Sequence, residues 1–142
     1  MDNDLATQLI EQSPDAVIFA GLDGVITVWN TAATRVFGQE ADDAIGKDLN
    51  IIIPEQFRDA HWKGFDRALA DGVTKYVGQV LPTRALRADG ETIYVELGFA
   101  IIKDASGIVS GAVATARDIT ERFNRDRETR RKLRELEAAQ KA

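Results

Sequence analysis

Three short turn signals constrain the fold of this 142-residue chain more than any other feature. The signals are Asp23-Gly24, Asp89-Gly90 and Ser106-Gly107, and each separates runs rich in β-branched and aromatic residues. Such dipeptides are typical of tight turns between strands, because glycine adopts a positive φ at little steric cost. Tight turns join antiparallel neighbours, whereas parallel strands need a long crossover connection. The sequence therefore predicts a sheet with antiparallel pairing.

The stretches around these turns predict the remaining elements. Strands are expected over residues 16–20, 25–29, 73–86, 92–102 and 108–117, with Pro82 indicating an edge or a bulge. Helices are expected over residues 3–12, 31–37, 41–45, 57–70 and 118–142. This order predicts an α+β fold, in which a five-stranded antiparallel sheet is covered on one face by short helices.

The length fits one domain with a helix at each end. We place an N-terminal flanking helix at residues 1–12, the domain at residues 13–118 and a C-terminal helix at residues 119–142. The C-terminal segment contains no Gly or Pro, but a heptad laid on it has apolar residues at only three of seven core positions. It predicts a long helix with a weak coiled-coil pattern.

Composition excludes several functions. The chain has no cysteine and a single histidine, His61, which excludes disulfides, iron–sulfur clusters and multi-histidine zinc sites. It has no apolar run long enough to span a membrane and no signal peptide, so we expect no membrane partner and a cytoplasmic location. The net charge is −8 over residues 1–116, and the basic residues of 117–142 alternate with acidic ones. This pattern argues against nucleic-acid binding.

Short motifs in this order resemble the PAS sensor domain family. The matching pieces are residues 13–16, 22–26, 29–33, 37–38, 45–47, 53–55, 88–90 and 117–120, and the resemblance covers about residues 8–121. No single motif is specific, but the order and spacing together are. The resemblance implies a small-ligand or cofactor pocket between the sheet and the helices. It also implies a homodimer whose flanking helices pass the signal to an effector.

His61 lies on an apolar stripe of the helix expected over residues 57–70. Phe57, His61, Phe65 and Ala68 are spaced at i, i+4, i+8 and i+11, which places them on the face toward the sheet. Small residues flank this stripe, so a flat molecule has room to approach the imidazole. Two interpretations remain open at this point: an axial ligand to haem iron, or a partly buried histidine bonded to a backbone carbonyl or water.

A second resemblance favours the first interpretation. Residues 53–61, followed by Gly64 and Phe65, look like the ligand helix of oxygen-sensing haem PAS domains. This resemblance implies haem b bound by His61 with a diatomic gas at the iron. In the ungapped register through the strand at Tyr76, Arg67 and Lys75 match cations that pair with haem propionates. Leu81 occupies the place of the arginine that steadies bound oxygen, and Arg84 follows three residues later.

We therefore expect a sensor and interaction module rather than an enzyme, with His61, Phe65, Arg67, Lys75, Tyr76 and Leu81 as cofactor-binding residues. Two alternatives remain. One is a PAS domain that binds another small ligand, and the other is a ligand-free dimerisation module whose cavity is filled by large side chains: Phe57, Phe65, Tyr76 and Phe99. A haem enzyme would need distal acid–base groups, which the sequence does not offer. Whether the chain is a complete protein or part of a longer one also stays open.

Dimer contacts are expected from both flanking helices. In the helix over residues 119–142, Ile119 and Phe123 are the apolar residues nearest the domain, and Leu5 and Leu9 offer a second contact. The same C-terminal helix is expected to reach a downstream signalling protein or effector domain.

Overall fold

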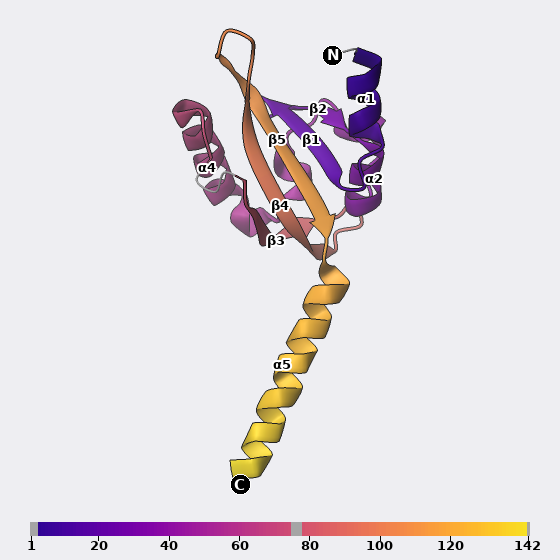
Figure 1. The fold of residues 1–142 in the computed structure, drawn as a ribbon, viewed down its shortest axis with the longest axis vertical. Helices are drawn as coiled ribbons and strands as arrows, with labels where there is room; N and C mark the ends of the chain where they lie inside the picture. The colour runs from indigo at the N-terminus through magenta and orange to yellow at the C-terminus, as the bar shows by residue number, and fades with distance from the viewer. Residues whose placement is uncertain (1–2, 75–77, 142) are drawn as a thin grey trace.

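The computed structural model describes residues 3–74 and 78–141, and its centre is a five-stranded antiparallel sheet (Figure 1). The strands are β1 (Ala16–Gly21), β2 (Ile26–Trp29), β3 (Val80–Leu86), β4 (Thr92–Lys103) and β5 (Val109–Asp118). Their order across the sheet is β2-β1-β5-β4-β3, and every neighbouring pair runs antiparallel. The predicted α+β fold is therefore confirmed.

Helices accompany the sheet and extend from it. They are α1 (Asn3–Glu11), α2 (Thr31–Phe37), α3 (Ala41–Ala44), α4 (Arg58–Asp71) and α5 (Thr120–Lys141), with 3₁₀ turns η1 (Leu49–Ile52) and η2 (Glu55–Phe57). Helices α2 to α4 lie between β2 and β3 in the chain, and α5 points away from the sheet (Figure 1). In residues 3–74 and 78–141 no helix has the length and apolar character needed to cross a membrane.

Asn30 fixes the junction between α1, β1 and α2. Its side chain is 1% exposed. The Oδ1 atom accepts hydrogen bonds from the backbone N–H groups of Val17 and Ala33, each at 2.9 Å, so Asn30 is the N-cap of α2. The Nδ2 atom donates to the carbonyl oxygens of Ile10 and Asp15. One buried amide therefore satisfies four backbone groups from three elements.

The end of α2 is equally well defined. Gly38 adopts a left-handed conformation with φ of 76°, which terminates the helix as expected for a glycine at this position. Arg87, from the segment after β3, donates to the carbonyl oxygen of Val36 at 2.7 Å. This bond ties the end of α2 to the end of β3.

Two elements differ from their predicted bounds. The strand expected over residues 73–86 begins at Val80 as β3, whereas Gly72, with φ of 71°, ends α4. Residues 75–77 of the expected strand lie outside the described residues. Pro82 lies within β3, and the edge position of this strand explains why a residue without a backbone N–H is tolerated there. The helix expected from Phe57 begins as the 3₁₀ turn η2 and becomes α4 at Arg58.

The first turn of α5 is attached to β4. Ile119 is 6% exposed, and its backbone N–H donates to the carbonyl oxygen of Tyr94. The ring of Phe123 stacks on the ring of Tyr94 with centroids 3.9 Å apart. Ile119 and Phe123 therefore pack against the domain, and Phe123 stays partly exposed.

Candidate functional site

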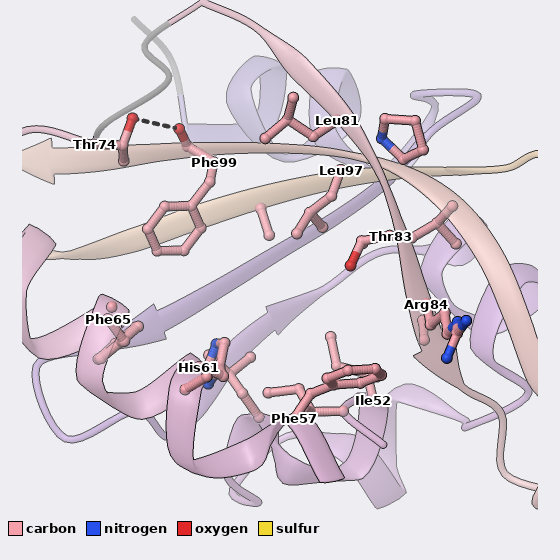
Figure 2. A pocket seen from close by; sticks show the side chains of 18 of the residues that line it. Ile52, Phe57, His61, Phe65, Thr74, Leu81, Thr83, Arg84, Leu97 and Phe99 are labelled. Atoms are coloured by element: carbon pink, nitrogen blue, oxygen red, sulfur yellow. Dashed lines mark hydrogen bonds between the residues drawn. The ribbon is translucent and has the colours of Figure 1, made fainter. Parts of the chain in front are cut away.

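A cavity of about 530 Å³ separates α4 from the sheet. Figure 2 shows Phe57, His61 and Phe65 on the helix side of this cavity, with Leu97 and Phe99 of β4 across from them. The lining is mostly apolar and also includes Ile52, Leu81, Val95 and Ala114. A mostly apolar cavity of this size, open to solvent on one side and with a few polar groups on its wall, is typical of small-ligand sites.

The helical spacing of α4 builds one wall of the cavity. All four residues of the predicted stripe, Phe57, His61, Phe65 and Ala68, line it. Ala60 and Gly64 lie on the same wall, and a Cβ added at Gly64 would meet no atom within 4 Å. The small residues therefore leave open space beside the imidazole, as the sequence indicated.

The His61 imidazole has no hydrogen-bond partner among the described residues. Its Nδ1 atom is buried and unpaired. Its ring contacts are aromatic, with centroid distances of 4.8 Å to Trp62 and 6.0 Å to Phe65. Burial lowers the pKa of His61 below its usual range, because the charged form loses its hydration. The imidazole is therefore neutral at pH 7, and one ring nitrogen keeps a lone pair that a metal can take.

Trp62 holds α4 in place, a role that the sequence did not reveal. Its Nε1 atom donates to Oδ1 of Asn50 at 2.8 Å. Its ring lies against Gly24 in the turn between β1 and β2, where an added Cβ would come within 2.5 Å of the indole. The turn signal at Asp23-Gly24 could have suggested a close approach, but not its partner. Trp62 therefore fixes the rotation of α4 and the direction of the adjacent His61.

The structure brings some of the predicted site residues together. His61, Phe65 and Leu81 all line the cavity, and Leu81 is on β3. Arg67 lies on an exposed part of α4 and does not line it. Lys75 and Tyr76 lie outside the described residues. Arg84, also on β3, does line the cavity.

The aromatic residues considered as cavity fillers lie on its walls. Phe57, Phe65 and Phe99 line the space and still leave about 530 Å³ between them. Trp29 is 3% exposed and donates from Nε1 to the carbonyl oxygen of Gln39. It belongs to the core between β2 and α2.

The described part of the chain contains no cluster of three or more His, Cys, Asp or Glu that could hold a metal ion. A metal at His61 would therefore need most of its ligands from another source. A macrocycle such as a porphyrin supplies four nitrogens in a plane and needs one axial ligand from the protein.

A family model described as the PAS fold matches residues 10–124, and the chain belongs to this family. Among curated proteins, it is 29% identical over 130 residues to the sensor protein FixL of Bradyrhizobium diazoefficiens, covering 92% of this chain and 25% of FixL. It is 38% identical over 90 residues to an uncharacterized protein of Azorhizobium caulinodans, covering 63% of this chain and 12% of that protein. The chain thus spans a quarter or less of these relatives.

Solved structures agree with the fold. The PAS domain of a protein from Colwellia psychrerythraea superposes with a TM-score of 0.72 at 22% identity, covering 83% of this chain and 97% of that domain. The PAS domain, in complex with ethanol, of a LuxR-family transcriptional regulator from Burkholderia thailandensis gives a TM-score of 0.61 at 19% identity, covering 84% and 98%. The chain is a PAS sensor domain.

Proposed function

We propose that this PAS domain binds haem b in the cavity between α4 and the sheet, with His61 as the axial ligand. The observation that carries the proposal is a neutral imidazole, free of hydrogen bonds, on the wall of a cavity with a mostly apolar lining. A buried ring nitrogen without a hydrogen-bond partner is costly unless something else binds it, which makes an unpaired imidazole in a cavity a candidate ligand-binding group. Haem, when bound, supplies an iron with an open axial position for a diatomic gas.

The residues present fit such a group. The cavity volume lies within the range of roughly 300–1,000 Å³ that is common for ligand pockets. Leu97 and Phe99 face His61 across the cavity and offer apolar contact to a flat ring (Figure 2). The similarity to a sensor protein over 92% of this chain supports a sensing role. The resemblance of α4 to the ligand helix of haem PAS domains supports this choice of cofactor.

The role proposed is sensing rather than catalysis. Among the described residues that line the cavity, His61 alone is a candidate for proton transfer near neutral pH, and no carboxylate orients it. Phe65 and Leu81 would contact the ring system, and Tyr76 is assigned to it by the resemblance. Arg67 and Lys75 are the cations that the resemblance pairs with the propionates.

The signal would leave the domain through β4. Val95, Leu97 and Phe99 of this strand line the cavity, whereas the neighbouring Tyr94 holds the first turn of α5. A ligand that binds one conformation of β4 more tightly than another shifts the population of both regions. The direction of α5 therefore depends on the ligand.

Titration with hemin tests the cofactor. Wild-type protein should give a sharp Soret band that shifts on reduction and again with carbon monoxide. His61→Ala should weaken hemin binding at least about 100-fold, and added imidazole should restore the wild-type spectrum. Lys63→Ala, at an exposed position on the same helix, is the matched control and should bind as wild type. An unchanged spectrum in His61→Ala would overturn the assignment, and the cavity would then hold another ligand.

We also propose that the domain forms a homodimer and that α5 contacts its effector. Leu133 and Leu136 lie one turn apart on α5 and are 53% and 61% exposed, and Leu5 and Leu9 are exposed on α1. Light scattering should give the mass of a dimer for residues 1–142 and the mass of a monomer for a chain ending at Asn124, which keeps Ile119 and Phe123 in place. The same number of copies per particle for both chains would exclude α5 as the dimer contact.

A further inference from the structure

Arg84 lies at the rim of the cavity, on the edge strand β3. The strand pairs with β4 on one side only, so the backbone around Arg84 faces solvent on the other. The side chain is exposed and also lines the cavity. Its guanidinium lies 5.8 Å from the ring centroid of Phe57, which lines the cavity from the start of α4 (Figure 2).

The hydrogen-bond donors of Arg84 are free, in contrast to those of neighbouring arginines. Arg58 donates to the carbonyl oxygen of Ile53 at 3.0 Å, and Arg87 donates to that of Val36 at 2.7 Å. Arg84 makes no hydrogen bond and no ion pair with any residue in the described ranges. A cation–π contact with Phe57 at this distance uses none of the guanidinium N–H groups as hydrogen-bond donors, so they remain available.

The cavity lining carries a positive charge and no negative charge among the described residues. No Asp or Glu occurs among the described lining residues, and Arg84 provides the single full positive charge there. An arginine with free donors beside an apolar cavity favours an anion, since a charge-assisted hydrogen bond is stronger where water is partly excluded. A carboxylate or sulfonate can bind the guanidinium edge through two parallel hydrogen bonds.

We infer that Arg84, beside Phe57, is an anion-recognition residue of this cavity, whose ligand is a mostly apolar molecule that carries an anionic group at the rim. The apolar body would lie between α4 and β4, and the anionic group would point out toward β3. The inference concerns the ligand's charge and not its iron, so it holds for any ligand of this class. It does not depend on the haem proposal.

Two fluorescent probes that differ in one charged group test the inference. 1-Anilinonaphthalene-8-sulfonate carries a sulfonate, and N-phenyl-1-naphthylamine has the same ring system without it. Both should bind the wild-type protein. Arg84→Leu should weaken the sulfonate probe about tenfold, as expected for the loss of one charge-assisted contact at a partly exposed site, and change the neutral probe less than about twofold. The affinity of Arg84→Lys for the sulfonate probe should lie between those of wild type and Arg84→Leu, because lysine keeps the charge but loses the planar pair of N–H donors.

Control variants separate this inference from the alternatives. Arg125→Leu removes an exposed arginine on α5, far from the cavity lining, and should leave both probes unchanged. Hemin titration of the wild-type protein tests the haem proposal without either probe, so failure of the haem proposal is visible separately. Four results would overturn the inference: no probe binding to wild type, equal weakening of both probes in Arg84→Leu, no weakening at all, or the same loss in Arg125→Leu.

Discussion

The two ends of the sheet differ in how completely their side chains are packed. At the packed end, defined here as β1, β2 and α2, the side chains of Ile18, Ile26 and Phe37 are at most 1% exposed. At the open end, defined as α4, β3 and the cavity between them, Phe57 and Leu81 are each 39% exposed. Interiors are normally filled to the density of organic crystals, so an unfilled region needs a reason.

The difference in packing matches two different roles, which are to hold the fold at the packed end and to leave room for a ligand at the open end. The packed end is held by Asn30, whose four hydrogen bonds specify a single arrangement of three elements. At the open end, β3 pairs with β4 along the sheet edge and the bond from Trp62 to Asn50 holds α4, but the space between α4 and β3 stays open for a ligand. The comparison indicates that one end determines the fold, whereas the other can change its residues without loss of the domain.

The largest expected effect contrasts one asparagine at each end. Asn30→Ala should lower the free energy of unfolding by about 4 kcal/mol, because four backbone groups lose their partner and some remain buried. Asn50→Ala should cost about 1 kcal/mol, since its side chain accepts a single bond, from Trp62. Urea denaturation followed by circular dichroism measures both. Equal losses of unfolding free energy in the two variants would contradict the proposed difference between the packed end and the open end.

A second contrast uses two alanines on the same face of β5. Ala112 is 3% exposed in the packed core, whereas Ala114, two residues along the strand, lines the cavity. Ala112→Leu should destabilise the domain by about 2–3 kcal/mol through overpacking. Ala114→Leu should cost less than about 1 kcal/mol, because the added carbons enter open space, and it should weaken probe binding. If Ala114→Leu were the more destabilising change, the cavity would be closed in solution.

The structure of the packed end could be predicted from the sequence because the patterns that determine it are local. Turn glycines, the cap at Asn30 and the alternation within β1 and β2 each act over a few residues. They predicted α2 within its observed bounds and β1 within one residue. The stripe on α4 was predicted for the same reason, since helical periodicity places Phe57, His61 and Phe65 together.

The structure of the open end could be predicted only in part, because its geometry depends on contacts between segments that are distant in the sequence. The packing of Trp62 against Gly24 joins residues nearly forty positions apart, and no local pattern encodes it. The late start of β3 was missed because residues 73–79 have strand-forming composition, yet Gly72 and Gly78 both adopt positive φ. The position of Arg84 over Phe57 likewise depends on how the edge strand meets α4.

The third prediction concerns Leu81 of β3 and rests on the proposal that the cavity binds haem. Leu81 lines the cavity from β3 and offers no hydrogen-bond donor to a bound gas. Leu81→Arg should slow oxygen dissociation from the reduced, hemin-loaded protein about tenfold, by adding one charge-assisted hydrogen bond. Carbon monoxide dissociation should change far less, because carbon monoxide gains little from a polar partner. Both rates can be followed by stopped-flow absorption.

Val80→Arg is the matched control for this change. Val80 precedes Leu81 on the same strand, is 55% exposed and does not line the cavity. An arginine there should leave the oxygen rate unchanged. Equal slowing by both arginines would indicate a general charge effect, and no slowing by Leu81→Arg would mean that residue 81 lies away from the gas.

The smallest expected effect tests whether water is excluded from the cavity around the His61 imidazole. Burial lowers the pKa of His61 in the folded, ligand-free protein, whereas in the unfolded chain a histidine titrates near its usual value of about 6.5. Below that pH the unfolded state therefore binds more protons than the folded state. The free energy of unfolding should accordingly be highest above about pH 6.5 and fall as the pH drops through the lower folded pKa.

Because His61 is the single histidine of the chain, His61→Ala isolates its contribution. The difference in unfolding free energy between wild type and His61→Ala should stay constant from pH 8 to about 6.5 and then shift against the wild type on acidification. Denaturation of the apoproteins in parallel measures this difference. If it stayed flat, water would reach the imidazole and the open end would be hydrated. If it shifted in favour of the wild type, His61 would be charged in the fold, which its apolar surroundings do not support.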